Sequence, residues 1–193
     1  FTNKGKVFKM KGYEIPESGR TAKGTAIVNL LPLAKEETIT AIIPIKEFSK
    51  DRYLFMATRH GIVKKTGLSE FDTNRKKTGL IALSLKENDE LIGVKLTDGN
   101  RQIIIGTRDG MSICFNEQDV RPMGRTARGV IGIKLKGEDT VIGMDNIRDD
   151  CEVLTVTEHG FGKRTATSEY RTQTRGGIGL INIKKKKKTG FVI

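Results

Sequence analysis

Short apolar runs, separated by glycines and polar clusters, recur along the whole chain. Examples are YLFMAT from Tyr53, IIIGT from Ile103 and VLTVT from Val153, and most of these residues are Val, Ile, Leu or aromatic. No segment keeps apolar residues at positions i, i+3, i+4 and i+7 for long enough to indicate a helix. Short runs bounded by turn-forming residues are typical of β-strands. The pattern therefore predicts an all-β protein.

Two series of glycines keep these runs in register. Runs such as YLFMAT lead into glycines of the first series: Gly5, Gly61, Gly110 and Gly160. Glycines of the second series open the runs GTAIVNLLPL, GLIALSLK, GVIGIKLK and GLINIK: Gly24, Gly79, Gly129 and Gly179. A further run closes each repeat: ITAIIPI from Ile39, LIGVKL from Leu91, VIGMDN from Val141 and FVI from Phe191. The repeat is about 50 residues long, a length typical of solenoids, propellers and arrays.

The register predicts four units, each built of four short strands, in one domain: 1–50, 51–100, 101–150 and 151–193. Four-stranded units repeated around a centre give a propeller-like disc or an open spiral. The alternative is one large sandwich whose periodicity is accidental. Both ends of the chain interrupt a predicted strand, so we expect the chain to be a piece of a longer polypeptide.

Composition narrows the class of protein. The chain has no run of 18 apolar residues that could span a membrane and no recognisable signal peptide. Cys114 and Cys151 are isolated, which matches neither a disulfide framework nor a zinc site. Two free thiols fit the reducing cytoplasm. These features predict a soluble cytoplasmic protein without a metal centre.

Basic residues follow the repeat. The formal net charge is +12, and nearly all of the excess lies between the paired glycines of the units. One arginine stands four residues before each glycine of the second series: Arg20, Arg75, Arg125 and Arg175. A cation placed identically in successive units suits a periodic polyanion, and the planar guanidinium can grip phosphate with two hydrogen bonds. We therefore predict a basic rim that binds nucleic acid through its phosphates.

Other basic residues extend this candidate surface. Lys23, Lys76, Lys77 and Arg128 enlarge the same segments. Lys9, Lys65 and Arg164 recur four positions after the first glycine, and Lys163 precedes the last of them. The alternative is that this second group comprises outward-facing strand residues that only keep the surface polar.

Catalytic and cofactor sites are not indicated. His60 and His159 occupy a turn position that holds Lys4 and Asp109 in the other units, so a catalytic or metal-binding role is not favoured. The chain has no GxxxxGK[ST] phosphate loop, and Gly176, Gly177 and Gly179 lack the strand–helix context of a dinucleotide site. We predict a non-catalytic chain that binds no cofactor.

Several stretches resemble the C-terminal domain of the DNA gyrase A subunit. They are GTAIVNLLPL, FMATRHGIVKKTGLSEF, DELIGVKLTDG, VRPMGRTARGVIGIKL and HGFGKRTATSEY. The resemblance implies a β-pinwheel, a propeller-like disc whose blades exchange strands, and a positive rim that wraps duplex DNA without reading its sequence. It further implies a role in ATP-dependent negative supercoiling by the whole type IIA topoisomerase. The implied partners are the rest of the gyrase A subunit and the gyrase B subunit, and the implied location is the bacterial cytoplasm, at the nucleoid. ATP, Mg²⁺ and the nucleophilic tyrosine are expected in other parts of that enzyme.

The family's marker is a seven-residue box, Q-R-R-G-G-K-G. The stretch 173–179 reads Q-T-R-G-G-I-G and keeps five of its positions: Gln173, Arg175, Gly176, Gly177 and Gly179. Thr174 and Ile178 replace two cations, so we interpret this copy as degenerate and expect the complete box upstream of Phe1. The corresponding domain of topoisomerase IV is the alternative within the class. A protein-interaction propeller that uses its central face is the alternative outside it.

Overall fold

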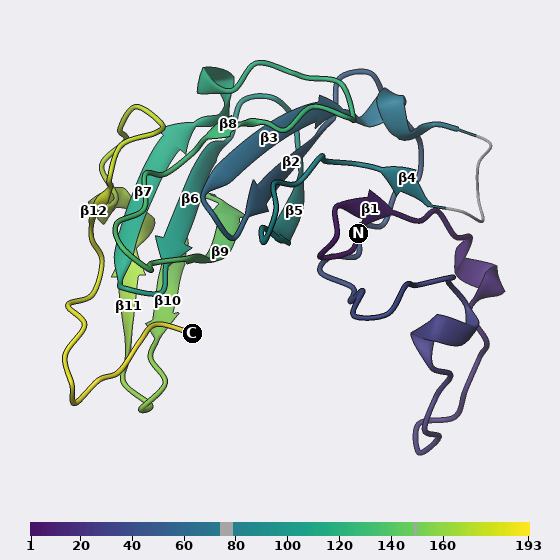
Figure 1. Cartoon of the computed structure of the whole chain (residues 1–193), viewed down its shortest axis with the longest axis horizontal. Coiled ribbons are helices and arrows are strands. Elements are labelled where there is room, and N and C mark those ends of the chain that lie inside the picture. The colour runs from purple at the N-terminus through teal and green to yellow at the C-terminus, as the bar shows by residue number, and fades with distance from the viewer. Residues whose placement is uncertain (74–78, 149) are drawn as a thin grey trace.

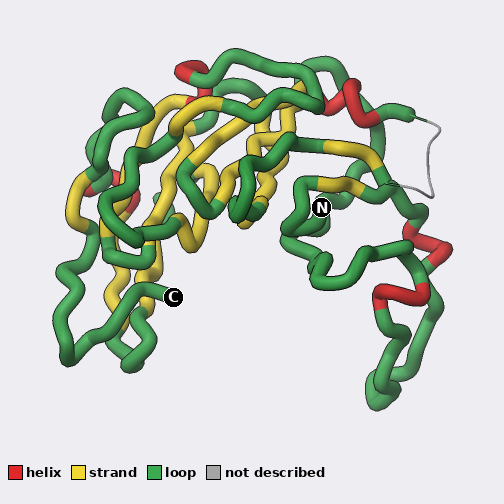
Figure 2. Tube along the Cα trace, in the orientation of Figure 1, coloured by secondary structure: helices red, strands yellow, loops and turns green. Residues whose placement is uncertain are grey.

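The computed structural model describes residues 1–73, 79–148 and 150–193, which form strands, short 3-10 turns and loops but no α-helix (Figures 1 and 2). The chain bends into an open arc with both termini on its concave side (Figure 1). The strands are β1 (Lys6–Val7), β2 (Tyr53–Thr58), β3 (Ile62–Gly67), β4 (Leu80–Ile81), β5 (Leu91–Thr97), β6 (Gln102–Thr107), β7 (Met111–Asn116), β8 (Val130–Ile131), β9 (Val141–Asn146), β10 (Glu152–Val156), β11 (Gly162–Ala166) and β12 (Leu180–Ile181). The 3-10 turns are η1 (Gly12–Glu14), η2 (Ile27–Asn29), η3 (Leu68–Phe71), η4 (Glu117–Asp119) and η5 (Thr167–Glu169). The all-β, propeller-like prediction is confirmed.

Antiparallel hairpins form the centres of the blades. They are β2–β3, β6–β7 and β10–β11. The tip of the first contains Gly61, whose φ is +82°, a backbone conformation that glycine adopts without steric cost. A Cβ atom at Gly61 would also lie 2.6 Å from the carbonyl oxygen of Ile133, in the next unit. The first glycine series therefore makes the hairpin turn and lets the following unit approach closely.

Each later unit lends a short strand to the unit before it. β4 pairs with β1, β8 pairs with β3 and β12 pairs with β7. We call these three the donated strands. The resulting four-stranded sheets have the orders β5-β2-β3-β8 and β12-β7-β6-β9. This exchange is the arrangement that the resemblance to a pinwheel implied.

Two apolar cores lie between consecutive blades. Successive residues of a strand point to opposite faces of the sheet, so β2 contributes to both cores. Leu54 and Met56 enter one core with residues of the first blade and of η3. Phe55 enters the other core with Phe115 of β7, and the two ring centroids are 6.3 Å apart. The β2–β3 sheet is therefore held on both faces.

The outer blades are less complete. In the first blade, β1 and β4 are supplemented by an isolated bridge between Thr2 and Ile39; in the fourth, β10 and β11 are supplemented by a bridge between Thr157 and Val192. The run GTAIVNLLPL, expected as a strand, instead contains η2, because no hairpin among the described residues accepts it. An unpartnered strand leaves its backbone N–H and C=O groups without hydrogen bonds, so the segment turns.

The glycine that precedes β8 offers a test of the strand exchange. Gly129 has a φ of +95°, and a Cβ atom there would lie 2.4 Å from the carbonyl oxygen of Val63. We expect Gly129→Ala to lower the free energy of unfolding by more than the roughly 1–2 kcal/mol that left-handed backbone alone costs an alanine. Denaturant unfolding measures this change.

Gly137→Ala is the matched control. Gly137 also has a positive φ, +55°, but nothing lies within 4 Å of a Cβ atom built on it. Equal losses of stability in the two variants would contradict the close approach at Gly129.

Candidate nucleic-acid interface

Arg125 and Arg175 lie on loops that precede the donated strands β8 and β12, and Arg20 lies in the equivalent segment of unit 1, which precedes η2. We call the segments 18–24, 73–79, 124–129 and 174–179 the arginine loops of units 1 to 4. The stretches from η4 to β8 and from η5 to β12, which contain the loops of units 3 and 4, follow the outer side of the arc (Figure 1). Three predicted contact residues lie outside the described residues: Arg75, Lys76 and Lys77.

The loop of unit 3 is fixed by its backbone and leaves its cations available. The Ser84 hydroxyl donates to the Thr126 carbonyl at 2.7 Å, and the Ser84 N–H donates to the Ala127 carbonyl at 3.4 Å. Arg125 is half-buried and Arg128 is exposed. Neither guanidinium forms an ion pair or a hydrogen bond with another described residue. The charge of this loop is therefore not neutralised from within.

A buried lysine supports the same loop from behind. Lys64, on β3, is 0% exposed, and its ammonium donates to the carbonyl of Ala82 at 2.6 Å and to the carbonyl of Arg125. Ala82 follows the donated strand β4 of unit 2, whereas Arg125 belongs to unit 3. One ammonium therefore links the segment that follows β4, in unit 2, to the arginine loop of unit 3.

Burial also changes the acidity of this lysine. Removal from water lowers the pKa of Lys64 to about 8, and the nearby positive charge of Arg125 contributes to that lowering. Glu70 acts in the opposite direction and raises the pKa. Burial has the largest effect of the three, and it lowers the pKa because it disfavours the charged form of an amine.

The loop of unit 4 is held in a different way. The Arg175 guanidinium donates through Nε to the carbonyl of Asp119 at 2.8 Å and through Nη1 to the carbonyl of Ile131 at 3.1 Å. The N–H of Gly176 donates to the carbonyl of Gly132 at 2.6 Å. Arg175 thus anchors its own loop to the preceding unit, and its hydrogen-bonding capacity is partly used inside the protein.

Lys65 lies inside the protein, which disagrees with its predicted place on the rim. Its side chain is 4% exposed, and its ammonium donates to the Glu117 carbonyl at 2.9 Å and lies 5.3 Å from the centre of the Tyr53 ring. Burial lowers the pKa of Lys65, and the negative charge of Glu117 opposes that change. The period of two along β3 cannot by itself show that Lys65 is inside, because η4 of the next unit covers it. We therefore leave Lys65 out of the candidate interface.

Two other predicted residues have acidic partners. The Lys9 ammonium lies 3.3 Å from an Asp72 carboxylate oxygen and 4.3 Å from the centre of the Phe48 ring. Arg164 lies 3.0 Å from a Glu152 carboxylate oxygen. Both cations are partly neutralised, so they are weaker candidates for contact with a polyanion.

The remaining predicted residues are on the surface or in the box-like segment. Four of them are exposed and have no acidic partner among the described residues: Arg20, Lys23, Arg128 and Lys163. In the segment 173–179, Gln173 donates its N–H to the carbonyl of Cys114 at 2.7 Å, and Gly176 and Gly179 have positive φ values of +79° and +75°. The three glycines of the segment shape its loop: Gly176, Gly177 and Gly179.

The sequence holds only a weak signal for Lys64, which the repeated basic positions do not include. Lys64 stands three residues after the first glycine of its unit. The equivalent residues of units 1 and 3 are Phe8 and Ile113, and Ile113 belongs to an apolar core. Unit 4 has Lys163 at this position, and Lys163 is exposed, so the apolar residues of units 1 and 3 do not by themselves predict that Lys64 is buried.

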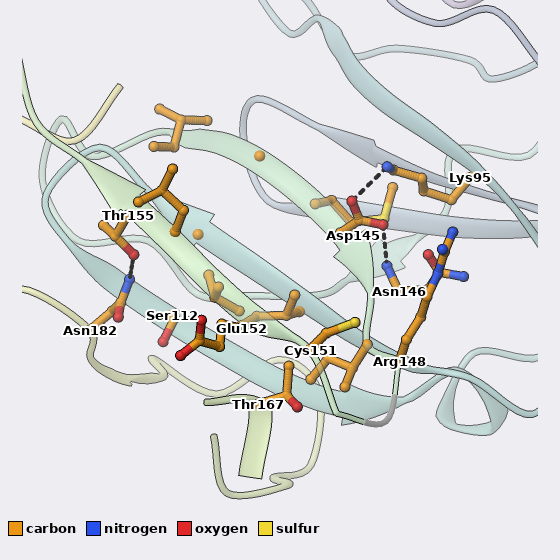
Figure 3. Close-up of a pocket in the computed structure, with 18 of the residues that line it drawn as sticks. Lys95, Ser112, Asp145, Asn146, Arg148, Cys151, Glu152, Thr155, Thr167 and Asn182 are labelled. Carbon is orange, nitrogen blue, oxygen red and sulfur yellow. Dashed lines mark hydrogen bonds and ion pairs between the residues drawn. The ribbon is translucent and has the colours of Figure 1, made fainter. Parts of the chain in front are cut away.

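A cleft of about 880 Å³ is lined mostly by residues of the third and fourth units, together with Ile43, Pro44 and the β5 residues Lys95 and Leu96 (Figure 3). Lys95 and Asp145 form an ion pair of 2.7 Å on its wall, and Arg148 and Glu152 also line it. None of the described residues of the arginine loops lines this cleft. Its mixed charges do not suit a polyanion, so it is not part of the candidate interface.

The described ranges contain no group of three or more His, Cys, Asp or Glu residues that could hold a metal ion. Within the same ranges, no helix is long and apolar enough to cross a membrane.

The geometry defines a class of protein: a propeller-like chain of strand-exchanging blades that carries basic loops along its outer side. Comparison with known families agrees with this class. The family model for "DNA gyrase C-terminal domain, beta-propeller" matches residues 1–46, 52–98, 101–148 and 152–193. The chain belongs to this family.

Relatives of known name are A subunits of DNA gyrase. The chain is 58% identical over 193 residues to the DNA gyrase A subunit of Clostridium acetobutylicum, and the match covers 100% of the chain and 23% of that protein. It is 59% identical over 129 residues to the DNA gyrase A subunit of Halalkalibacterium halodurans, covering 67% of the chain and 15% of that protein. The chain thus spans about a quarter or less of the relatives it matches.

Solved structures share the fold. The C-terminal domain of DNA topoisomerase IV superposes with a TM-score of 0.91 at 31% identity, covering all of this chain and 60% of that one. A DNA gyrase A C-terminal domain superposes with a TM-score of 0.83 at 28% identity, covering all of this chain and 62% of that one. Sequence identity is higher to the gyrase A subunits named above than to the topoisomerase IV domain.

The lowered pKa of Lys64 predicts a pH-dependent stability. The unfolded chain keeps this proton up to the ordinary lysine pKa of 10.5, whereas the folded chain releases it near 8. Between these values the unfolded state binds more protons, so the free energy of unfolding should rise with pH. Urea unfolding at a series of pH values from about 7 to 10 measures the slope, and Lys64→Met should flatten it.

Lys134→Met serves as the control, because Lys134 is exposed. It should leave the slope of the wild-type chain unchanged. A slope in Lys64→Met equal to that of the wild type would show that Lys64 does not titrate in this range.

Proposed function

We propose that this chain is the DNA-binding part of a gyrase A subunit, which holds duplex DNA by its phosphates along the arginine loops. The observation that carries the proposal is the state of the cations on the described loops of units 1 and 3. These cations have no acidic partner among the described residues: Arg20, Lys23, Arg125 and Arg128. A cation without an internal partner can replace the counterions condensed on a duplex, which favours binding of any sequence.

The chemistry favours phosphates over base edges. The described residues contain no α-helix that could enter a major groove. Arginine side chains on short loops can reach phosphate oxygens, and such contacts set the position and path of a duplex without reading its bases. We therefore infer recognition that is independent of sequence.

Repetition of the loops along a curved edge supports wrapping. Bending 20–30 bp of duplex smoothly costs roughly 1–6 kcal/mol, which additional phosphate contacts can offset. In the complete enzyme, a wrapped segment would be presented to the strand-passage gate with a defined handedness, and ATP-dependent negative supercoiling would follow. The chain itself would be non-catalytic and without cofactors, in the bacterial cytoplasm, with the rest of the gyrase A subunit and with the gyrase B subunit as partners.

Two observations favour gyrase over the alternatives. The relatives that cover the whole chain at 46–58% identity are A subunits of DNA gyrase. The cations without acidic partners lie on the arginine loops, and none of the described residues of those loops lines the cleft near the inner strands. Binding of duplex DNA therefore remains the favoured function over a protein-interaction propeller.

A salt titration of duplex binding tests the proposal. The logarithm of the binding constant should fall linearly with the logarithm of salt concentration, with a slope of about −0.9 for each phosphate contacted. The quadruple variant Arg20→Gln, Lys23→Gln, Arg125→Gln and Arg128→Gln should make this slope shallower by up to about 0.9 for each phosphate that is no longer neutralised. Fluorescence anisotropy with duplexes of unrelated sequence measures both.

A matched variant separates loop position from net charge. Lys35→Gln, Lys50→Gln, Lys134→Gln and Lys136→Gln remove the same charge from exposed positions outside the arginine loops. This control should keep the wild-type slope. Wild-type binding that does not respond to salt, or equal effects of the two quadruple variants, would refute the proposed rim.

A further inference from the structure

Two backbone carbonyls at equivalent positions of successive units accept hydrogen bonds from different kinds of donor. Ala82 and Gly132 each stand three residues after the second glycine of their unit. The Lys64 ammonium donates to the carbonyl of Ala82, whereas the N–H of Gly176 donates to the carbonyl of Gly132. The two arginine loops are therefore attached to equivalent acceptors by a side chain in one case and by backbone in the other.

Loop sequence accounts for this exchange of donors. Gly176 reaches its acceptor with a φ of +79°, in the left-handed region. Its equivalent in unit 3 is Thr126, which does not have a positive φ. A β-branched residue is strongly disfavoured in that region, so the loop of unit 3 cannot use the same backbone hydrogen bond. A donor on the neighbouring strand is then needed, and Lys64 supplies it.

The two arginines differ accordingly. The Lys64 ammonium also holds the Arg125 carbonyl, and the Arg125 guanidinium has no partner among the described residues. Behind the loop of unit 4, the residue equivalent to Lys64 is Ile113, which is fully buried and offers no donor. There the Arg175 guanidinium turns inward and donates to two carbonyls.

We infer that Lys64 is a positioning residue for DNA binding: its ammonium anchors the arginine loop of unit 3 so that Arg125 faces the phosphates, whereas Arg175 anchors its own loop and contacts no phosphate. The inference rests on the proposed function and deepens it. It assigns different roles to arginines that occupy the same position in the repeat. Where a lysine lies behind the loop, it supplies the hydrogen-bond donor and the arginine can contact DNA. Where an isoleucine lies there, the arginine itself forms the hydrogen bonds that hold the loop.

Single substitutions in the full chain test these roles by two measurements, the salt slope of duplex binding and the free energy of unfolding. Arg125→Ala should make the slope shallower by about 0.9, which corresponds to roughly eightfold weaker binding at about 0.1 M salt, and should leave unfolding almost unchanged. Arg175→Ala should do the reverse: the slope stays at the wild-type value, and the chain unfolds at a lower urea concentration.

Lys64→Ile gives unit 2 the residue that unit 3 has at the equivalent position, Ile113. It should make the salt slope of duplex binding shallower and lower the free energy of unfolding. Lys64→Met keeps the length of the side chain without its donors and provides a second variant if the first does not fold. In either background, a further Arg125→Ala substitution should add little to the loss of binding, since the loop no longer presents that side chain. Additive losses would overturn the positioning role.

A rescue experiment tests the exchange of donors. Thr126→Gly and Ala127→Gly, added to Lys64→Ile, reproduce the glycine pair of unit 4 and should restore the free energy of unfolding. The slope should stay reduced, because Arg125 is then in the surroundings of Arg175. A triple variant as unstable as Lys64→Ile would overturn the inference.

The outcomes separate this inference from the proposed function. Wild-type binding that does not respond to salt would refute DNA binding by the rim itself. A steep wild-type slope that falls equally in Arg125→Ala and Arg175→Ala would leave the proposed function standing and refute only the division of roles.

Discussion

The lending of a strand by each later unit to the unit before it is the constraint on which the other features depend. A hairpin such as β2–β3 completes its sheet only when β8 of the next unit lies beside β3. The exchange brings a backbone carbonyl within 2.6 Å of where a side chain on Gly61 would begin. It therefore requires glycine at the hairpin tip, and it places the arginine loop, which leads into the donated strand, over the neighbouring blade.

This placement explains why cations that look alike in the repeat have different surroundings. A loop that crosses from one unit to another must hydrogen-bond its carbonyls to the blade that receives it. Lys64 of the receiving blade donates to a carbonyl of the loop of unit 3, whereas Arg175 of the loop of unit 4 donates to carbonyls of the preceding unit. Both are charged donors, which form stronger hydrogen bonds than neutral ones. Lys65 connects β3 to the carbonyl of Glu117 in the following unit. Cations without such contacts remain at the surface, and in the proposed function their unneutralised charge binds the duplex.

Much of the architecture could be predicted from the sequence because apolar runs and glycines recur in register. β2 coincides with the predicted run YLFMAT, and β9 coincides with VIGMDN. The run GTAIVNLLPL is apolar like the runs that become β4, β8 and β12, yet it contains η2. It differs from them in Pro32 and in the two residues after its glycine, which are Thr25 and Ala26 instead of Leu or Val followed by Ile. A strand forms only where an acceptor hairpin is present, and composition does not record which hairpin a segment meets.

The candidate site was predictable in outline and not in detail. Three features depend on spacing along the chain and could be predicted from it: the all-β repeat, the concentration of positive charge in one segment of each unit and the arginine within that segment. Three others depend on contacts between units and became visible in the fold: Lys65 is buried, Arg175 donates to carbonyls of the preceding unit, and Lys64 lies behind Arg125. The physical reason is that a cation's surroundings are set by the neighbouring unit, roughly 50 residues away in a repeat of this size.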